Sequence, residues 1–139
     1  MDKSLDTNDI ICNKYKVIDF LGKGSFGCVY RVLNISNNKY YAIKTEDINS
    51  KYNYLEEEYK LYKKIMKHPG IPNIYYYGTY KNFNVLTLSC LGNNLGTLFK
   101  YCDKMFSIKT ISMIMIQMID ILSHIHSFGV IHKDIKPDN

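Results

Sequence analysis

GKGSFGCV, at residues 22–29, joins two runs of β-forming residues, one over 15–21 and one over 28–33. Both runs are rich in the β-branched and aromatic residues that favour strands. The glycines are therefore predicted at the tip of a hairpin, whereas a dinucleotide-binding fold needs them between a strand and a helix. A hairpin tip without Cβ atoms can lay its backbone N–H groups over phosphates. On this motif alone, a flexible turn with no ligand remains an open alternative.

The residues around this hairpin predict an antiparallel sheet with one helix packed on it, which is an α+β fold. Residues 39–44 read as a third strand, and residues 74–79 and 83–89 read as two more. Residues 54–67 have apolar side chains near a 3.6-residue period, which predicts an amphipathic helix. The sequence His-Pro-Gly-Ile-Pro at 68–72 ends that helix, because proline cannot continue the hydrogen-bond ladder. The first ten residues are polar and lack periodicity, so we expect a loose tail there.

Helical signals replace strand signals after residue 91. A short helix is predicted near 97–102 and a long one from Ser107 to Gly129, whose Ile and Met stripe is typical of a core face. The turn-rich segment from Leu91 to Gly96 is the best candidate for a joint between domains. We therefore predict a tail over 1–14, a sheet lobe over 15–88, a hinge at 89–92 and the start of a helical lobe over 93–139.

The composition is that of an ordinary globular protein, with 46% hydrophobic and 22% charged residues. No uncharged apolar run reaches the roughly 18 residues that span a bilayer, so no membrane partner is expected. The four cysteines are widely spaced and lack a zinc-ligand pattern, so we expect reduced thiols. The net charge of +5 comes from scattered lysines, and no nucleic-acid partner is expected. The expected location is cytoplasmic or nuclear.

Lys44 ends the third predicted strand, where an ammonium group is placed to reach the phosphates of a nucleotide. Such an ammonium needs an anionic partner. The following helix offers Glu56, Glu57 and Glu58, of which only one can point at Lys44 along a given line. Without the neighbouring motifs, each of these side chains would be interpreted as a solvated surface group.

VIHKDIKPDN, at residues 130–139, fits the pattern H-x-D-x-K-x-x-N. Phosphoryl transfer to an alcohol needs a carboxylate that receives the hydroxyl proton, a cation against the transferring phosphate and an oxygen ligand for Mg²⁺. Asp134, Lys136 and Asn139 supply these three groups in that order. Chance does not readily place this pattern behind the two earlier motifs in one chain. ATP and Mg²⁺ are therefore the predicted ligands.

These motifs resemble those of eukaryotic-type protein kinases, and the sequence between them resembles the casein kinase 1 family. The resemblance covers about Lys14 to Asn139. Its most specific segments are 60–63, 70–74, 77–78, 84–86, 91–92, 95, 98–99, 106–110 and 117–119. The resemblance implies a two-lobed serine/threonine kinase that transfers the γ-phosphate of MgATP to protein hydroxyls. It also implies protein substrates that are usually acidic or already phosphorylated.

The resemblance also assigns roles to individual residues. It implies that Glu58 pairs with Lys44, that Leu88 is the gatekeeper, and that the backbone C=O of Ser89 and N–H of Leu91 contact adenine. The remaining nucleotide contacts that it implies are Leu21, Gly22, Lys23, Gly24, Ser25, Phe26, Gly27, Cys28, Val29 and Ala42.

The sequence departs from the family pattern in three places. Lys133 replaces the usual arginine, which keeps the charge but loses the planar, bidentate fork. Gly96 and Thr97 replace acidic residues, so a carboxylate contact to the ribose is not expected. The sequence ends at Asn139, before any D-F-G motif with the main Mg²⁺ ligand. We therefore expect that this chain alone does not phosphorylate efficiently and that it exposes the apolar face of its long helix. The alternative function is an inactive kinase fragment that binds nucleotide or protein.

Overall fold

The computed structural model of the chain describes residues 5–24 and 27–139. Ser25 and Phe26, two predicted nucleotide contacts, lie outside the described residues. The chain divides into two compact units. The sheet unit consists of Met1–Lys64 and Pro72–Cys90, and the helical unit consists of Ile65–Ile71 and Leu91–Asn139.

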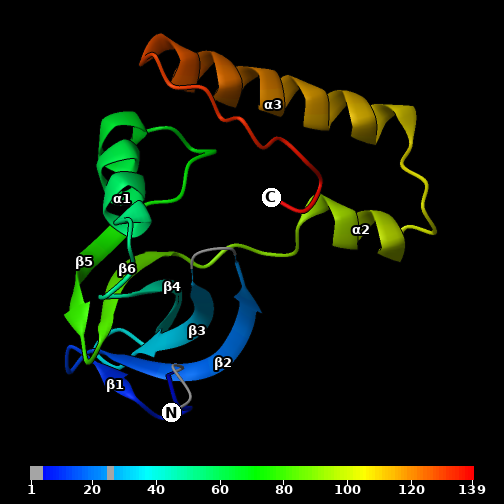
Figure 1. The fold of residues 1–139 in the computed structure, drawn as a ribbon. Coiled ribbons are helices and arrows are strands. Elements are labelled where there is room, and N and C mark those ends of the chain that lie inside the picture. The colour runs from blue at the N-terminus through cyan, green and yellow to red at the C-terminus, as the bar shows by residue number, and fades with distance from the viewer. Residues whose placement is uncertain (1–4, 25–26) are drawn as a thin grey trace. The chain divides into compact units, whose positions relative to one another are not determined.

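The sheet unit is a six-stranded antiparallel sheet with the strand order β1-β2-β3-β4-β6-β5 and one helix, α1 (Figure 1). Its strands are β1 Ile10–Ile11, β2 Tyr15–Lys23, β3 Cys28–Asn34, β4 Lys39–Asp47, β5 Ile74–Tyr80 and β6 Phe83–Ser89, and α1 spans Tyr54–Ile65. The predicted α+β fold is confirmed. Among the described residues, only β1 is an element that the sequence did not predict.

Two hydrophobic clusters cover the two faces of this sheet. Val32, Ile43 and Val85 belong to the first cluster and are fully buried. The second cluster joins Leu55 of α1 to Leu86 and Leu88 of β6. Residues that are paired across antiparallel strands share a face. Because Lys44 pairs with Leu86, the Lys44 side chain lies on the face that α1 covers.

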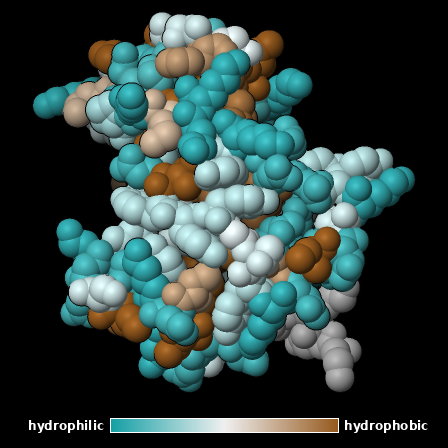
Figure 2. Space-filling view, turned by 90° about the vertical axis from the view of Figure 1, so that its left-hand side faces the viewer, coloured by the Kyte–Doolittle hydropathy of each residue, from teal (hydrophilic) through white to brown (hydrophobic). Residues whose placement is uncertain are grey.

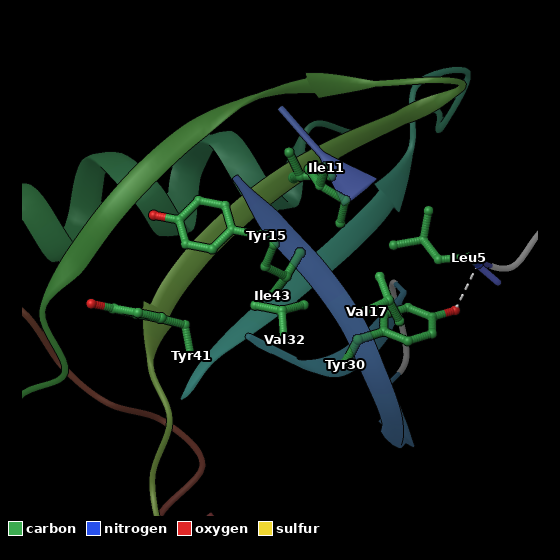
Figure 3. Close-up of a cluster of buried hydrophobic side chains, with 9 residues drawn as sticks. Leu5, Ile11, Tyr15, Val17, Tyr30, Val32, Tyr41 and Ile43 are labelled. Carbon is green, nitrogen blue, oxygen red and sulfur yellow. Dashed lines mark hydrogen bonds between the residues drawn. The ribbon is translucent and has the colours of Figure 1, made fainter. Parts of the chain in front are cut away.

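The predicted tail is partly wrong, because Leu5 and Ile11 belong to the core. Leu5 and Ile11 are 6% and 0% exposed, and β1 pairs with β2. Figure 3 shows both side chains in the cluster around Tyr30, whose hydroxyl accepts a hydrogen bond from the Leu5 N–H at 3.1 Å. Lys81 donates to Asp9 at 2.8 Å. Burial opposes ionisation of Asp9, but the contact with Lys81 and the hydrogen bonds from the Asp6 N–H and Tyr80 together outweigh it and lower the Asp9 pKa.

The outer surface of α1 is hydrophilic. Its exposed residues include Lys60, Lys63 and Lys64. Figure 2 shows the side of the molecule on which α1 and β5 lie in Figure 1, where hydrophilic residues predominate and hydrophobic ones form small separate groups. Leu55, Tyr59 and Tyr62 of α1 instead pack on the sheet, which is the arrangement that an amphipathic helix favours.

The helical unit contains α2 (Leu95–Tyr101) and α3 (Ile108–Ser127). Both helices begin at a side-chain cap. Asn94 accepts from the Thr97 N–H at 2.7 Å, and Ser107 accepts from the Thr110 N–H at 3.1 Å. Gly129, with φ +68°, ends α3 in the left-handed conformation that glycine favours. The two predicted helices are confirmed.

The segment Ile65–Ile71, at the end of α1 and after it, belongs to the helical unit and contacts α3. His68 Nε2 lies 3.0 Å from Asp120 Oδ2, and His124 Nε2 lies 2.8 Å from the Ile65 carbonyl oxygen. A Cβ atom at Gly70 would lie 2.4 Å from Ile121 Cδ1. Glycine therefore allows this loop to approach the helix closely.

The apolar stripe of α3 is largely exposed. Ile108, Ile116 and Ile119 are 84%, 68% and 61% exposed, and Ile125 is the buried residue of the helix. The apolar face of α3 is therefore exposed in this chain, as expected from the position of the last residue. The interpretation of the same Ile and Met stripe as a core face does not hold in this chain. By length and composition alone α3 is also able to span a membrane. This is weak evidence for a membrane span, because core helices of soluble proteins have the same properties.

Candidate functional site

The centre of the candidate site is the ion pair between Lys44 Nζ on β4 and Glu58 Oε1 on α1. The two side chains are 35% and 30% exposed. Glu56 and Glu57 instead each lie 3.0 Å from Lys60 Nζ on the outer surface of α1. The helical repeat thus turns one of the three consecutive glutamates toward the sheet and the other two toward a surface lysine.

A small cavity of about 120 Å³ lies beside this ion pair. Its lining residues are Gly24, Gly27, Cys28, Val29, Lys44, Thr45, Glu46, Tyr54, Leu55 and Glu58. The described part of the glycine-rich hairpin therefore lies on the same cavity as Lys44. This volume is below the roughly 300 Å³ at which pockets for whole organic ligands begin, so the cavity suits a group of phosphate size.

Gly27 brings the hairpin against β4. A Cβ atom at this position would lie 1.7 Å from the Thr45 carbonyl oxygen, a distance that no side chain tolerates. The Gly24 N–H also donates to the Gly27 carbonyl oxygen at 2.8 Å, which closes the turn. Position 27 needs glycine because the β4 backbone leaves no room for a Cβ atom, and not because of a positive φ angle.

The other predicted nucleotide contacts among the described residues of the sheet unit lie on β2, β4 and β6 and do not line this cavity. Gly22 and Lys23 end β2, where they pair with Val29 and Cys28. Leu21 is 51% exposed on β2. Ala42 pairs with Leu88, which is 4% exposed and packs in the cluster under α1.

Two predicted adenine contacts lie at the end of the sheet unit and beyond it. Ser89 ends β6 and pairs with Tyr41. Leu91 is 69% exposed and is assigned to the helical unit. Of the predicted nucleotide contacts, Gly24, Gly27, Cys28, Val29 and Lys44 line this cavity, whereas Ala42, Leu88 and Ser89 of the same unit do not.

A second candidate site is the loop at the end of the helical unit. Lys136 Nζ lies 2.9 Å from Asp134 Oδ2. The Asn139 side-chain nitrogen donates to the same oxygen at 2.9 Å and to the Asp134 carbonyl oxygen at 2.6 Å. The hydrogen bonds from Lys136 and Asn139 lower the pKa of Asp134. These contacts therefore favour the ionised form of the carboxylate, which is the form that can accept a proton.

Lys133 has a backbone conformation that its residue type disfavours. Its φ angle is +65°, in the left-handed region, which costs a non-glycine residue about 1–3 kcal/mol. The conformation turns the chain so that the Asp134 N–H donates to His132 Nδ1 at 3.3 Å. Strain of this kind collects at functional sites, and nothing in the sequence alone indicated it.

The fit of Mg²⁺ depends on Asn139. Its amide nitrogen donates to Asp134, so its amide oxygen is the atom that would ligate a metal ion. Magnesium is usually held by one or two protein oxygens together with phosphates and waters, and Asn139 fits as one of them. Within residues 5–24 and 27–139, no cluster of three or more His, Cys, Asp or Glu side chains forms a separate metal site.

Two further features of the structure were not predicted from the sequence. Glu46 lines the small cavity and is 1% exposed, although isolated charged residues are rarely buried. The helical unit also has a larger, mostly apolar cavity of about 620 Å³. Its lining includes Leu95, Phe99, Phe106 and Met115, and none of the predicted site residues lines it.

Comparisons with known proteins agree with the motifs. The family model described as "Protein kinase domain" matches residues 15–139. The whole chain is 40% identical to a protein of fission yeast, Schizosaccharomyces pombe, named Casein kinase I homolog 3, and covers 32% of its length. It is also 40% identical over 125 residues to Casein kinase I homolog 2 of the same organism, which is 90% of this chain and 29% of that protein. The chain thus spans about a third of the length of these relatives.

Proposed function

Because the chain belongs to the protein kinase family, we propose that it is the ATP-binding portion of a casein kinase 1-like serine/threonine kinase. The complete kinase would transfer the γ-phosphate of ATP to hydroxyl groups of proteins. The observation that carries this proposal is the Lys44–Glu58 ion pair beside the cavity of the glycine-rich hairpin.

The nucleotide-binding role is assigned to the sheet unit. Lys44 is the cation that lines the cavity, and its ammonium would bind the α and β phosphates of ATP. Glu58 would hold this ammonium in place, since a lysine has four freely rotating side-chain bonds. The glycines would let the hairpin backbone donate N–H groups to the phosphates without steric hindrance.

The transfer role is assigned to the loop of Asp134, Lys136 and Asn139. The Asp134 carboxylate would accept the proton of the substrate hydroxyl as the oxygen forms its bond to the γ-phosphorus. The bond from that phosphorus to the bridging β–γ oxygen breaks, and ADP leaves. Lys136 would stabilise the negative charge on the transferring group. A Mg²⁺ ion held in part by Asn139 would neutralise charge on the phosphates.

The finer assignments rest on the family resemblance. We assign acidic or already phosphorylated proteins as the substrates, and the net charge of +5 agrees with such partners. We assign Leu88, Ser89 and Leu91 to the adenine contacts, with the hinge at 89–92. The proposed location is the cytoplasm or the nucleus.

A thermal-shift titration tests the nucleotide-binding part of the proposal. We expect ATP to raise the melting temperature of the protein in a concentration-dependent manner, because a ligand that binds the folded state stabilises it. AMP, which lacks the β and γ phosphates, should stabilise less at the same concentration. If neither ATP nor MgATP raises the melting temperature at millimolar concentration, the proposed function is wrong.

A further inference from the structure

Glu46 is a buried carboxylate with an incomplete set of hydrogen bonds. Its Oε1 accepts a hydrogen bond from the Leu55 N–H at 3.3 Å. Its Oε2 has no hydrogen-bond partner, and within the described residues the only other buried side-chain polar atom of this kind is Thr87 Oγ1. An unpartnered buried oxygen on a charged group is costly, so its presence needs an explanation.

The contact with Leu55 joins β4 to the first turn of α1. The first N–H groups of a helix have no partner within the helix, and the N-terminus attracts negative charge through the helix dipole. Glu46 meets both requirements from a neighbouring element. Because Leu55 is 5% exposed, water competes little for this contact.

The position of Glu46 relates this contact to the Lys44–Glu58 ion pair. Lys44 and Glu46 are two residues apart on β4, so they share one face of the strand. Leu55 and Glu58 are three residues apart on α1, so they share one face of the helix. The same two elements are therefore joined at two neighbouring points, one buried and one about a third exposed.

We propose that Glu46 is a positioning residue that fixes the first turn of α1 on β4 and thereby holds Glu58 against Lys44. This inference rests on the proposed function of that ion pair. A partly exposed ion pair is weakened by solvent and does not by itself fix a helix. The buried contact, which is shielded from water, supplies the constraint in this arrangement.

This role predicts that function and stability respond in opposite ways when Glu46 is replaced. An apolar residue of similar volume removes a buried carboxyl group whose second oxygen has no hydrogen-bond partner, and such replacements are often neutral or stabilising. The same replacement releases the first turn of α1. A residue with only a structural role would lose stability and function together.

The test compares the full-length protein with its Glu46→Met and Glu46→Gln variants, using ATP with casein as the acceptor. For Glu46→Met we expect an unchanged or higher melting temperature and a fall in kcat/KM for ATP on the order of 10- to 100-fold. Glu46→Gln should recover most of that loss, because its amide oxygen still accepts the Leu55 N–H. Glu57→Gln, which removes an exposed charge from the same helix, is the matched control and should behave as the wild type.

A double variant shows whether Glu46 acts through Glu58. We expect Glu46→Met combined with Glu58→Gln to be no worse than Glu58→Gln alone, because both remove the same constraint. The inference is overturned if the losses of kcat/KM in the two single variants add up in the double variant. It is also overturned if Glu46→Met keeps the wild-type kcat/KM. A different result refutes the proposed function, namely phosphoryl transfer that is retained in Lys44→Met. If Lys44→Met loses transfer while Glu46→Met keeps the wild-type kcat/KM, the positioning role of Glu46 is refuted and the proposed function stands.

Discussion

Lys44 on β4 and Glu58 on α1 form an ion pair across 14 residues of sequence. Each side chain is about a third exposed, so solvent screens their attraction and the pair adds little to folding stability. Its consequence is orientation: it holds an ammonium group at the cavity beside the glycine-rich hairpin. The pair is thus expected to matter for phosphate binding and transfer far more than for the fold.

Lys44→Met should abolish phosphoryl transfer in the full-length protein and leave the fold intact. The free energy of unfolding should change by no more than about 1 kcal/mol, the usual limit for a partly exposed ion pair. Transfer of labelled phosphate from ATP to casein and urea unfolding measure the two effects. Lys60→Met, which removes the partner of Glu56 and Glu57 on the outer face of α1, is the matched control. Substantial transfer by Lys44→Met would refute the role of Lys44.

Asp134→Asn should reduce kcat by about 10²- to 10⁴-fold, the range that a positioned proton acceptor contributes. An amide cannot accept the hydroxyl proton, although it keeps the shape of the side chain. The affinity for ATP should change little, because the cavity that contains Lys44 lies in the sheet unit. Steady-state kinetics and a binding titration separate the two quantities. Turnover near the wild-type rate in Asp134→Asn would show that another group accepts the proton.

The pKa of Asp134 should lie below the ordinary aspartate value of about 3.9, because Lys136 and Asn139 donate to its carboxylate. Lys136→Met should raise this pKa, which a carbon-detected NMR titration of the carboxyl group measures. The sign for stability follows from the lowered pKa. The contribution of the Asp134 contacts to folding stability is fully present above the unfolded-state pKa. It is lost as the pH falls through the lower, folded-state pKa.

A matched substitution tests whether this pKa effect is local. Lys109→Met removes one positive charge from the start of α3 and should leave the Asp134 titration where it is in the wild type. If both methionine variants shift the titration equally, the cause is the net charge of the protein and not the contact at 2.9 Å.

The motifs of this chain could be predicted because each is local. The glycines at 22–27, the strand ending in Lys44 and the loop from His132 to Asn139 each depend on a few consecutive residues. The core positions of Leu5 and Ile11 could not be predicted in this way, since the cluster that contains them also includes residues of β3, β4 and β6, which are distant in sequence. Glu46 was missed for a related reason. Nothing near it in sequence indicates that it is buried.

Ile11→Ala should destabilise the protein by about 2–5 kcal/mol, because it leaves a cavity where a fully buried side chain was. Its neighbour Ile10 is 45% exposed and is the matched control. Ile10→Ala should change the free energy of unfolding by no more than about 0.5 kcal/mol. Urea denaturation of both variants measures the difference. Equal, small effects would mean that the N-terminal segment is the loose tail that its polar sequence suggests.

Gly27→Ala should weaken ATP binding and lower the melting temperature, whereas Gly22→Ala should leave the melting temperature unchanged. A Cβ atom at Gly27 would lie 1.7 Å from the Thr45 carbonyl oxygen, so the hairpin must move away from β4. Overpacking of this kind costs about 1–3 kcal/mol. A Cβ atom at Gly22 would have no other atom within 4 Å, and the backbone there is not left-handed.

The two variants carry the same substitution in the same motif. A difference between their melting temperatures therefore reports the close contact of the hairpin with β4. A flexible turn without a ligand would tolerate alanine at both positions, because it is free to shift. Loss of ATP affinity in Gly27→Ala alone would show that the hairpin must lie against β4 when the nucleotide binds. Equal behaviour of the two variants would instead favour the flexible turn.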